Sequence, residues 1–150
     1  MKVVIQRVKK SSVSINNSIK SEIGKGLLLL VGFEKDDNED DLVWMGNKII
    51  SLRIFDDNDG IMNLSVKDIN GELLVISQFT LHAKTKKGNR PSYIKAAKPE
   101  ISIPLYEQFI KELKKNIGSE LKTGEFGADM QVSLINDGPV TIIIDSKNKK

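Results

Sequence analysis

The sequence predicts a mixed α/β protein that folds as one domain over residues 1–150. Segments with the apolar pattern of β-strands occur along the whole chain, and two other segments repeat apolar residues at three- and four-residue spacing, as helices do. The length of 150 residues fits one domain, and no repeat, linker or low-complexity block divides the chain. A domain of this size buries roughly 70% of the surface of its unfolded chain, so it can form a core without staples.

Strands account for most of the N-terminal part of the chain. They are predicted over 3–8, 12–16 and 19–23, and the Asn16-Asn17 pair suits a tight turn before the last of these. Residues 27–33 form a continuous apolar segment, which is typical of a strand covered on both faces.

The first predicted helix begins within the acidic residues 36–41, because negative charge is favourable where a helix begins. Its apolar face consists of Leu42, Met45, Ile49 and Leu52. The second helix is predicted over 104–117, with Gly118 as its C-cap and four apolar residues turned inward, namely Leu105, Phe109, Ile110 and Leu113.

The segments around and after the helices alternate between strands and loops. Residues 55–60 are predicted to form a turn, because their acidic pattern lacks the spacing and the closing Glu of a calcium-binding EF-hand loop. A strand is predicted over 73–81, and a basic loop with Pro and Gly over 84–99. Two last strands, 130–135 and 140–144, are predicted to be neighbours joined by a turn.

Composition removes several classes of function. The chain has no cysteine, which excludes disulfides, thiol nucleophiles and cysteine-ligated metals, and its single histidine excludes a His-rich metal site. We therefore expect neither a metal nor a cofactor. The longest apolar run, 27–31, is far shorter than the roughly 20 residues that span a bilayer, and the N-terminus lacks the apolar core of a signal peptide. The expected location is the cytoplasm, with no membrane partner.

The net charge of +3 is small, but several basic residues gather in the segment from His82 to Lys98. This segment contains no acidic residue and carries Lys84, Lys86, Lys87, Arg90, Lys95 and Lys98. Two interpretations are open: the segment contacts the phosphates of a nucleic acid, or it is a solvated loop.

Polar residues interrupt the strand predicted over 73–81. Ser77, Gln78 and Thr80 follow an apolar run, and polar side chains at such a position either bond to one another or face a pocket. The single histidine, His82, is expected on the surface rather than as a general base, so no Ser-His-Asp triad is predicted.

The turn Asn136-Asp137-Gly138-Pro139 is the second unusual feature. A cis peptide bond costs far less before proline than elsewhere, and glycine places no side chain over the backbone. The turn therefore suits either a backbone wall that a ligand approaches closely or an ordinary tight turn.

At these two places the sequence resembles the D-aminoacyl-tRNA deacylase family. That family's signatures are a Ser-Gln-x-Thr strand end, here Ser77-Gln78-Phe79-Thr80, and an Asn-x-Gly-Pro-Val-Thr turn, here residues 136–141. Shorter blocks of likeness run along the chain at 4–8, 26–28, 53–55, 88–92 and 127–130. The sequence departs from the family at His82, where a tyrosine is usual, and at the variable position of Glu125.

The resemblance implies a three-layer α/β/β fold, with a mixed, mostly antiparallel sheet system and two main helices. It also implies a homodimeric cytoplasmic hydrolase that removes D-amino acids from the 3′ end of tRNA, with active sites at the subunit interface. Gly138 and Pro139 would hold the amino acid of the substrate and reject L-enantiomers, and Arg7 would brace their turn. Ser77, Gln78, Phe79 and Thr80 would line the ester as the catalytic strand end.

Two mechanisms and two functions remain open from the sequence. Either Thr80 attacks the ester or a water molecule does, and water is favoured because the chain offers no base to activate the threonine. The basic residues Lys84, Lys86, Lys87 and Arg90 would bind RNA in the deacylase. A non-catalytic nucleic-acid-binding module is the alternative function, although such a module needs neither signature.

Overall fold

The computed structural model describes residues 1–150 and contains both predicted helices. The elements in chain order are β1 (Lys2–Ile15), β2 (Ser18–Ile23), β3 (Gly26–Gly32), α1 (Glu39–Ser51), β4 (Phe55–Asp56), β5 (Met62–Leu64), β6 (Glu72–Ser77), the 3-10 turn η1 (Phe79–His82), α2 (Pro99–Ile117), β7 (Leu121–Thr123) and β8 (Gln131–Asp145).

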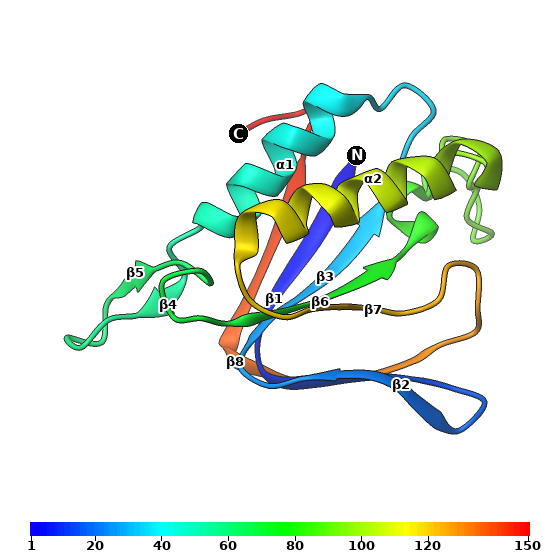
Figure 1. Ribbon diagram of the computed structural model, residues 1–150. Helices are drawn as coiled ribbons and strands as arrows, with labels where there is room; N and C mark the ends of the chain where they lie inside the picture. The colour runs from blue at the N-terminus through cyan, green and yellow to red at the C-terminus, as the bar shows by residue number, and fades with distance from the viewer.

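The main sheet has six strands, with the order β2-β1-β3-β6-β7 and with β8 paired to β1. Strand β1 is antiparallel to β2, β3 and β8, whereas β3, β6 and β7 run parallel to one another. Both helices cover the same face of the sheet, while the far parts of β1 and β8 bend away with β2 beneath its other face (Figure 1). Neither helix is long and apolar enough to cross a membrane.

Two separate apolar cores confirm the three-layer arrangement. Because successive side chains of a strand point to opposite faces, β3 and β6 contribute to both cores. Leu27 and Leu29 belong to the larger cluster, which fills the space under the helices and includes Met45 and Phe109. Leu28 belongs to a smaller cluster on the opposite face, together with residues of β1 and β2 such as Val13 and Ile23.

The helix boundaries partly differ from the prediction. Helix α1 begins after Asn38, whose side chain accepts hydrogen bonds from the N–H groups of Asp40 and Asp41, and acidic residues fill its first turn as predicted. Helix α2 begins at Pro99 rather than at Pro104. Both prolines suit a first turn, but Pro99 takes that position and the helix continues through Pro104. The predicted C-cap, Gly118, has the left-handed conformation with φ 71°.

Two predicted pairs of strands are each one long strand. Residues 3–8 and 12–15 both belong to β1, while Asn16, predicted as the last residue of the second strand, lies in the turn instead. Register shifts in the pairing with β8 occur around Val8, close to the polar segment between the two predicted strands. Residues 130–135 and 140–144 were expected to lie beside each other, but both halves of β8 pair with β1 instead. The very short strands β4, β5 and β7 were not predicted, because two or three residues carry no periodic pattern.

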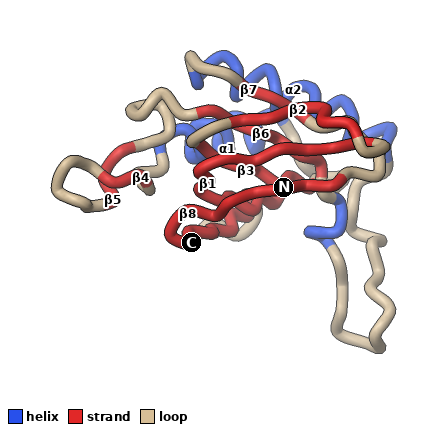
Figure 2. The backbone as a smooth tube through the Cα atoms, turned by 90° about the horizontal axis from the view of Figure 1, so that it is seen from below, coloured by secondary structure: helices blue, strands red, loops and turns tan.

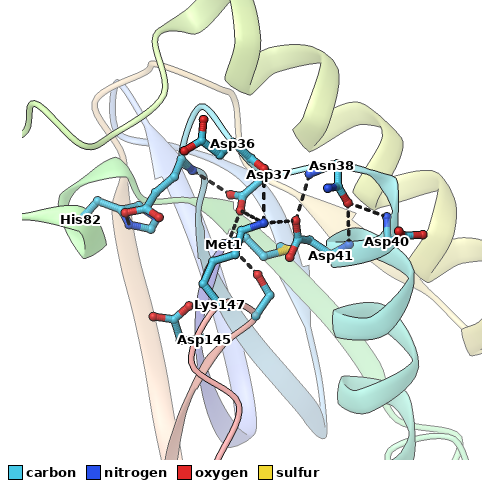
Figure 3. Close-up of polar contacts among 11 residues, drawn as sticks. Met1, Asp36, Asp37, Asn38, Asp40, Asp41, His82, Asp145 and Lys147 are labelled. Carbon is cyan, nitrogen blue, oxygen red and sulfur yellow. Dashed lines mark hydrogen bonds and ion pairs between the residues drawn. The ribbon is translucent and has the colours of Figure 1, made fainter.

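A buried polar cluster fixes the N-terminus against the start of α1 (Figure 3). The ammonium group of Met1 contacts the Asp37 carboxylate and donates to Ser146 Oγ at 2.8 Å. Nearby, Lys147 Nζ lies 2.6 Å from Asp41 Oδ2. Burial acts to raise the pKa of Asp41, but hydrogen bonds from Lys147, Ser146 and the Asn38 backbone outweigh it and lower the pKa below its ordinary value.

Replacing Lys147 with methionine is expected to lower stability more at neutral pH than in acid. A carboxylate whose folded-state pKa is lowered stabilises the fold above its ordinary pKa, and this contribution disappears as the pH falls. A partly exposed pair contributes about 0.5–1 kcal/mol, so Tm should fall by about 2–3 °C at pH 7. Thermal unfolding of both proteins between pH 7 and pH 3 tests this, and a Tm difference that does not shrink in acid would contradict it.

Candidate active site

The predicted strand end is a strand followed by a tight turn. Strand β6 stops at Ser77, and Phe79–His82 form the 3-10 turn η1, so the prediction of a strand through Leu81 was wrong. The N–H of Gln78 donates to the carbonyl of Val31 at 2.7 Å, and Leu81 N–H then donates back to the Gln78 carbonyl at 3.3 Å. A contact with the neighbouring strand therefore holds the residue at which the chain turns.

A small cavity of about 90 Å³ lies at this turn. It is lined by Ser77, Gln78 and Phe79 together with apolar groups from other elements, including Phe33, Ala97 and Phe126. The cavity sits at the carboxyl ends of the parallel strands β3 and β6, which is where α/β sheets usually bind ligands. The strand end thus faces a pocket, as one of the two sequence interpretations required.

The other interpretation is also met in part, because two of the polar side chains bond to each other. Gln78 Nε2 donates to Thr80 Oγ1 at 2.6 Å. An amide group is no base at neutral pH, so this contact orients Thr80 without activating its hydroxyl as a nucleophile.

The backbone of η1 supplies further polar groups. Phe79 and Thr80 are its first two residues, and the first N–H groups of a helical turn have no partner within it. The Phe79 side chain is 56% exposed. These donors therefore border an accessible site.

His82 is buried, which corrects the expectation of a surface residue. Only 2% of it is exposed, and its Nδ1 lies 3.2 Å from Glu34 Oε1. Gly32 explains how the ring enters, since a Cβ there would lie 3.1 Å from the imidazole and 2.7 Å from the Gln78 carbonyl. Sequence reasoning missed Glu34 and Gly32, and the only available signal was a glycine at the end of an apolar strand.

The Gly138-Pro139 turn lies within β8 and is exposed. Its peptide bond is cis, and Gly138 has φ 131°. The side chain of Asn136 spans the turn, accepting from Val140 N–H at 2.8 Å and donating to Thr141 Oγ1 at 2.9 Å. The two exposed residues are therefore held from within the turn.

Arg7 supports the turn from the protein interior, where only 7% of the residue is exposed. Its Nε donates to the carbonyl of Asp137 at 2.9 Å, and its Nη1 donates to the carbonyl of Ile54 at 2.7 Å. Asp56 and Asp137 lie within 3.8 Å of the guanidinium as ionic partners.

One chain does not bring the turn and the strand end together. Along β3, Leu27 is level with Arg7 and therefore with the turn, whereas Val31 is level with Ser77. Four residues of a strand span about 13 Å. The two sequence signatures thus lie at opposite ends of the sheet within one chain.

The basic segment forms a loop after η1 that projects from the body of the fold (Figure 2). Lys84 and Ser92 pair through two backbone hydrogen bonds of 2.8 and 3.0 Å, which fix the base of the loop. Lys84, Lys86, Lys87 and Arg90 are all exposed. The loop therefore presents free positive charge beside η1.

Comparisons with known proteins identify the family. The sequence profile of the D-Tyr-tRNA(Tyr) deacylase family matches residues 4–145. Proteins named D-aminoacyl-tRNA deacylase from Flavobacterium psychrophilum and Bacteroides fragilis are 66% and 65% identical, each over the full length of both chains. The chain belongs to the D-Tyr-tRNA(Tyr) deacylase family.

Solved structures agree with this deacylase fold. A structure titled "c-Myc DNA Unwinding Element Binding Protein" superposes with a TM-score of 0.91 at 40% identity and covers 97% of this chain and 98% of its own. A probable eukaryotic D-amino acid tRNA deacylase has a TM-score of 0.82 at 16% identity, with 95% and 97% of the two chains covered, and supports the fold alone. In this deacylase-family chain, no three His, Asp or Glu side chains gather in an arrangement that could hold a metal ion.

Proposed function

We propose that this deacylase hydrolyses the ester bond between a D-amino acid and the 3′ end of tRNA, and that it leaves L-aminoacyl-tRNA intact. The observation that carries the proposal is the family match over residues 4–145 of a chain that retains both signatures. Such a substrate would place the enzyme in the cytoplasm. The direct experiment is hydrolysis of D-aminoacyl-tRNA by the purified protein.

In this proposal the ester lies against the strand end and η1. The N–H groups of Phe79 and Thr80 stabilise the oxyanion that develops as the carbonyl is attacked. The attacking group is water, assisted by the 2′-hydroxyl of the terminal adenosine, because Thr80 has only the Gln78 amide beside it. As the bond between the carbonyl carbon and the ribose 3′ oxygen breaks, one proton of the attacking water passes by way of the 2′-hydroxyl to that 3′ oxygen, which leaves as the hydroxyl of the free tRNA. The amino acid departs as a carboxylate, and the second proton of the water goes to solvent.

Replacement of Thr80 with alanine is expected to lower kcat by about tenfold or less, the value of one hydrogen bond, because Thr80 positions the ester and does not attack it. Single-turnover hydrolysis of a D-aminoacyl-tRNA measures this rate. Rapid quenching followed by mass spectrometry provides the second measurement. An acyl group trapped on Thr80, or a nearly complete loss of activity in a folded Thr80→Ala protein, would contradict attack by water.

Selection against L-amino acids is assigned to the turn. Backbone carbonyls of Gly138 and Pro139 would accept hydrogen bonds from the α-amino group of the substrate. An L side chain would then collide with the turn, while a D side chain would point outward. Gly138 has no Cβ, both residues are exposed, and Arg7 with Asn136 holds the turn, so the wall is accessible and braced.

The turn and the strand end form one site only if two subunits combine. A two-fold dimer places the same patch of each subunit against the other, so the turn of one chain can reach the strand end of its partner. Strand β8 lies at the edge of the sheet and exposes apolar side chains on both sides of the turn, namely Leu134, Ile135 and Ile143, the last of which is 72% exposed. These features support a homodimer in which β8 is the interface.

A cavity beside the end of β8 supports this arrangement. It has a volume of about 740 Å³ and is lined by Val4, Leu81 and the end of β8, including Ile142 and Ile143. Leu81 belongs to η1, so one wall of the cavity lies next to the strand end, while other walls come from α1 and the C-terminal residues. We assign it as the place into which the partner's turn inserts.

The basic loop is proposed to bind phosphates of the tRNA. If Lys84, Lys86, Lys87 and Arg90 make these contacts, each adds roughly 0.9 or less to the log–log slope of affinity against salt. Changing all four to glutamine should flatten this slope and raise KM, as measured by hydrolysis at several salt concentrations. A control variant removes three positive charges elsewhere, those of Lys111, Lys114 and Lys115 near the C-terminal end of α2, and should keep the wild-type slope. An unchanged slope in the loop variant would show that the loop is only solvated surface.

A nucleic-acid-binding module without catalysis is the second candidate. It is favoured by one observation, the 40% identity with the structure titled as a DNA-unwinding-element-binding protein. The two candidates separate in a simple test, because a binding module would retain affinity for tRNA without releasing the amino acid. The full strand-end and turn signatures favour the enzyme.

A further inference from the structure

A second cavity adjoins the cavity at the strand end. It has a volume of about 470 Å³ and runs between residues 34–36 and 94–98. Ala97 lines both cavities, and its N–H donates to the carbonyl of Phe33 at 2.9 Å. The two cavities are therefore neighbours on either side of this backbone contact, and a ligand that extends beyond the small cavity would meet the second cavity, which we call the 34–98 groove.

The rim between the two cavities exposes large apolar side chains. Ile94 is 80% exposed, and Tyr93 and Phe79 are 39% and 56% exposed. The rings of Phe79 and Tyr93 meet edge to face, with their centroids 5.1 Å apart. Exposure of such a patch to water is unfavourable, and large apolar patches often mark binding sites. Unpaired nucleobases stack on aromatic side chains and pack against apolar ones.

The charge of the groove suits the backbone that carries such bases. Lys35, Lys95 and Lys98 line it and form no salt bridge. Two carboxylates, those of Glu34 and Asp36, also line it, so the lysines outnumber the acids by three to two. An apolar rim combined with a surplus of lysines is typical of sites for single-stranded nucleic acid.

We propose that the 34–98 groove binds the unpaired nucleotides of the tRNA that immediately precede the esterified one. Their bases lie against Phe79, Tyr93 and Ile94, and their phosphates lie near Lys95 and Lys98. This inference rests on the proposed function, since it extends the substrate from the ester at the strand end. It assigns the groove a task separate from that of the Lys84–Arg90 loop, which lies farther out and would contact phosphates beyond the unpaired end.

Three substrates of increasing length distinguish binding by the groove from binding by the Lys84–Arg90 loop. The first is a D-aminoacyl-adenosine, the second is the same amino acid on the RNA trinucleotide CCA, and the third is the full D-aminoacyl-tRNA. If the groove binds the added nucleotides, kcat/KM rises from the nucleoside to the trinucleotide in the wild-type protein. Loss of one apolar contact to a base together with two lysines near the phosphates is worth about tenfold. The variant Ile94→Ser/Lys95→Gln/Lys98→Gln should therefore lower the trinucleotide-to-nucleoside ratio by about tenfold or more.

Two controls accompany this variant. The variant Lys111→Gln/Lys114→Gln changes two exposed lysines near the C-terminal end of α2. It should leave the trinucleotide-to-nucleoside ratio as in the wild type. The loop variant, with Lys84, Lys86, Lys87 and Arg90 changed to glutamine, should lower only the step from trinucleotide to tRNA. A ratio that does not change in the groove variant, or a wild-type protein that gains nothing from the trinucleotide, would overturn the proposal.

Binding of the uncharged CCA trinucleotide distinguishes failure of the groove from failure of the activity. We expect a Kd that rises about tenfold in the groove variant, as followed by NMR titration of the amide signals of residues 94–98. If the protein hydrolyses no aminoacyl ester but binds the trinucleotide with this dependence, the proposed activity is wrong and the groove is correct. If it hydrolyses the esters and the groove variant binds the trinucleotide as tightly as the wild type, only the groove assignment is wrong.

Discussion

Replacing Phe79 with proline should lower kcat about 100- to 1,000-fold further than replacing it with alanine does. Both changes remove the aromatic ring, but only proline removes the backbone N–H that we assign to the oxyanion. Loss of one such donor has this magnitude in other acyl-transfer enzymes. Single-turnover hydrolysis of D-aminoacyl-tRNA by the two variants measures this difference. The difference isolates the contribution of the Phe79 N–H group to the rate.

The local structure makes this comparison feasible. Phe79 is the first residue of η1, a position that proline tolerates because the N–H there has no partner within the turn. Gln78, with φ −145° and ψ 82°, lies outside the α region, as the residue before a proline must. Matching Tm values for the two variants would show that the fold is retained. Equal activities in two folded proteins would remove the Phe79 N–H from the mechanism.

Two inactive variants should restore activity when they share a dimer. Gly138→Ala is expected to be inactive, since Gly138 has φ 131° and a Cβ there would lie 3.0 Å from both Arg7 Nη2 and Val140 Cγ2, which displaces the turn. Phe79→Pro removes the N–H donor that we assign to the oxyanion at the strand end. In a heterodimer of the two variants, one site combines an intact turn with an intact strand end, so about half of the wild-type activity per dimer should return.

The heterodimer is obtained by co-expression of the two variants with different affinity tags and sequential purification. Each homodimer, carried through the same steps, serves as the control and should show almost no turnover. Size-exclusion chromatography establishes that dimers have formed. A heterodimer that forms but stays inactive would show that each turn serves its own chain, which would require a large movement of β8 because the two signatures are about 13 Å apart along the sheet.

Much of the fold could be predicted because local patterns agree with tertiary packing. The acidic residues before Leu42 mark the start of α1, and the buried face of that helix contains the predicted Leu42, Met45 and Ile49. The Asn16-Asn17 turn has the positive φ values, 50° and 63°, that such a pair tolerates. In these segments the residue pattern and the surrounding structure favour the same conformation.

The rest depends on contacts between distant segments. Gln78 makes the last bond of β6 to the neighbouring strand, to Val31, before the chain turns into η1, and nothing in the apolar pattern of 73–81 shows that the pairing stops there. His82 is buried because Gly32, fifty residues earlier in the chain, leaves room for its ring. The continuity of β8 through Gly138 and Pro139 likewise comes from its pairing with β1.

The candidate site was predictable as a set of residues but not as an arrangement. Polar residues after an apolar strand pointed to Ser77, Gln78 and Thr80, and the structure places Ser77 and Gln78 at a cavity. The separation of that cavity from Gly138 follows from strand register, which residue patterns do not specify. The site shared by two subunits that we propose would unite the two signatures.

Chiral selection by the turn is the central claim, and a matched pair of substrates tests it most directly. The purified protein is incubated with the same tRNA charged with D-tyrosine or with L-tyrosine, and release of the amino acid is followed in parallel with protein-free controls. We predict rapid hydrolysis of the D-ester, while the L-ester decays at its spontaneous rate. Equal hydrolysis of both esters, or faster hydrolysis of the L-ester, would contradict the account.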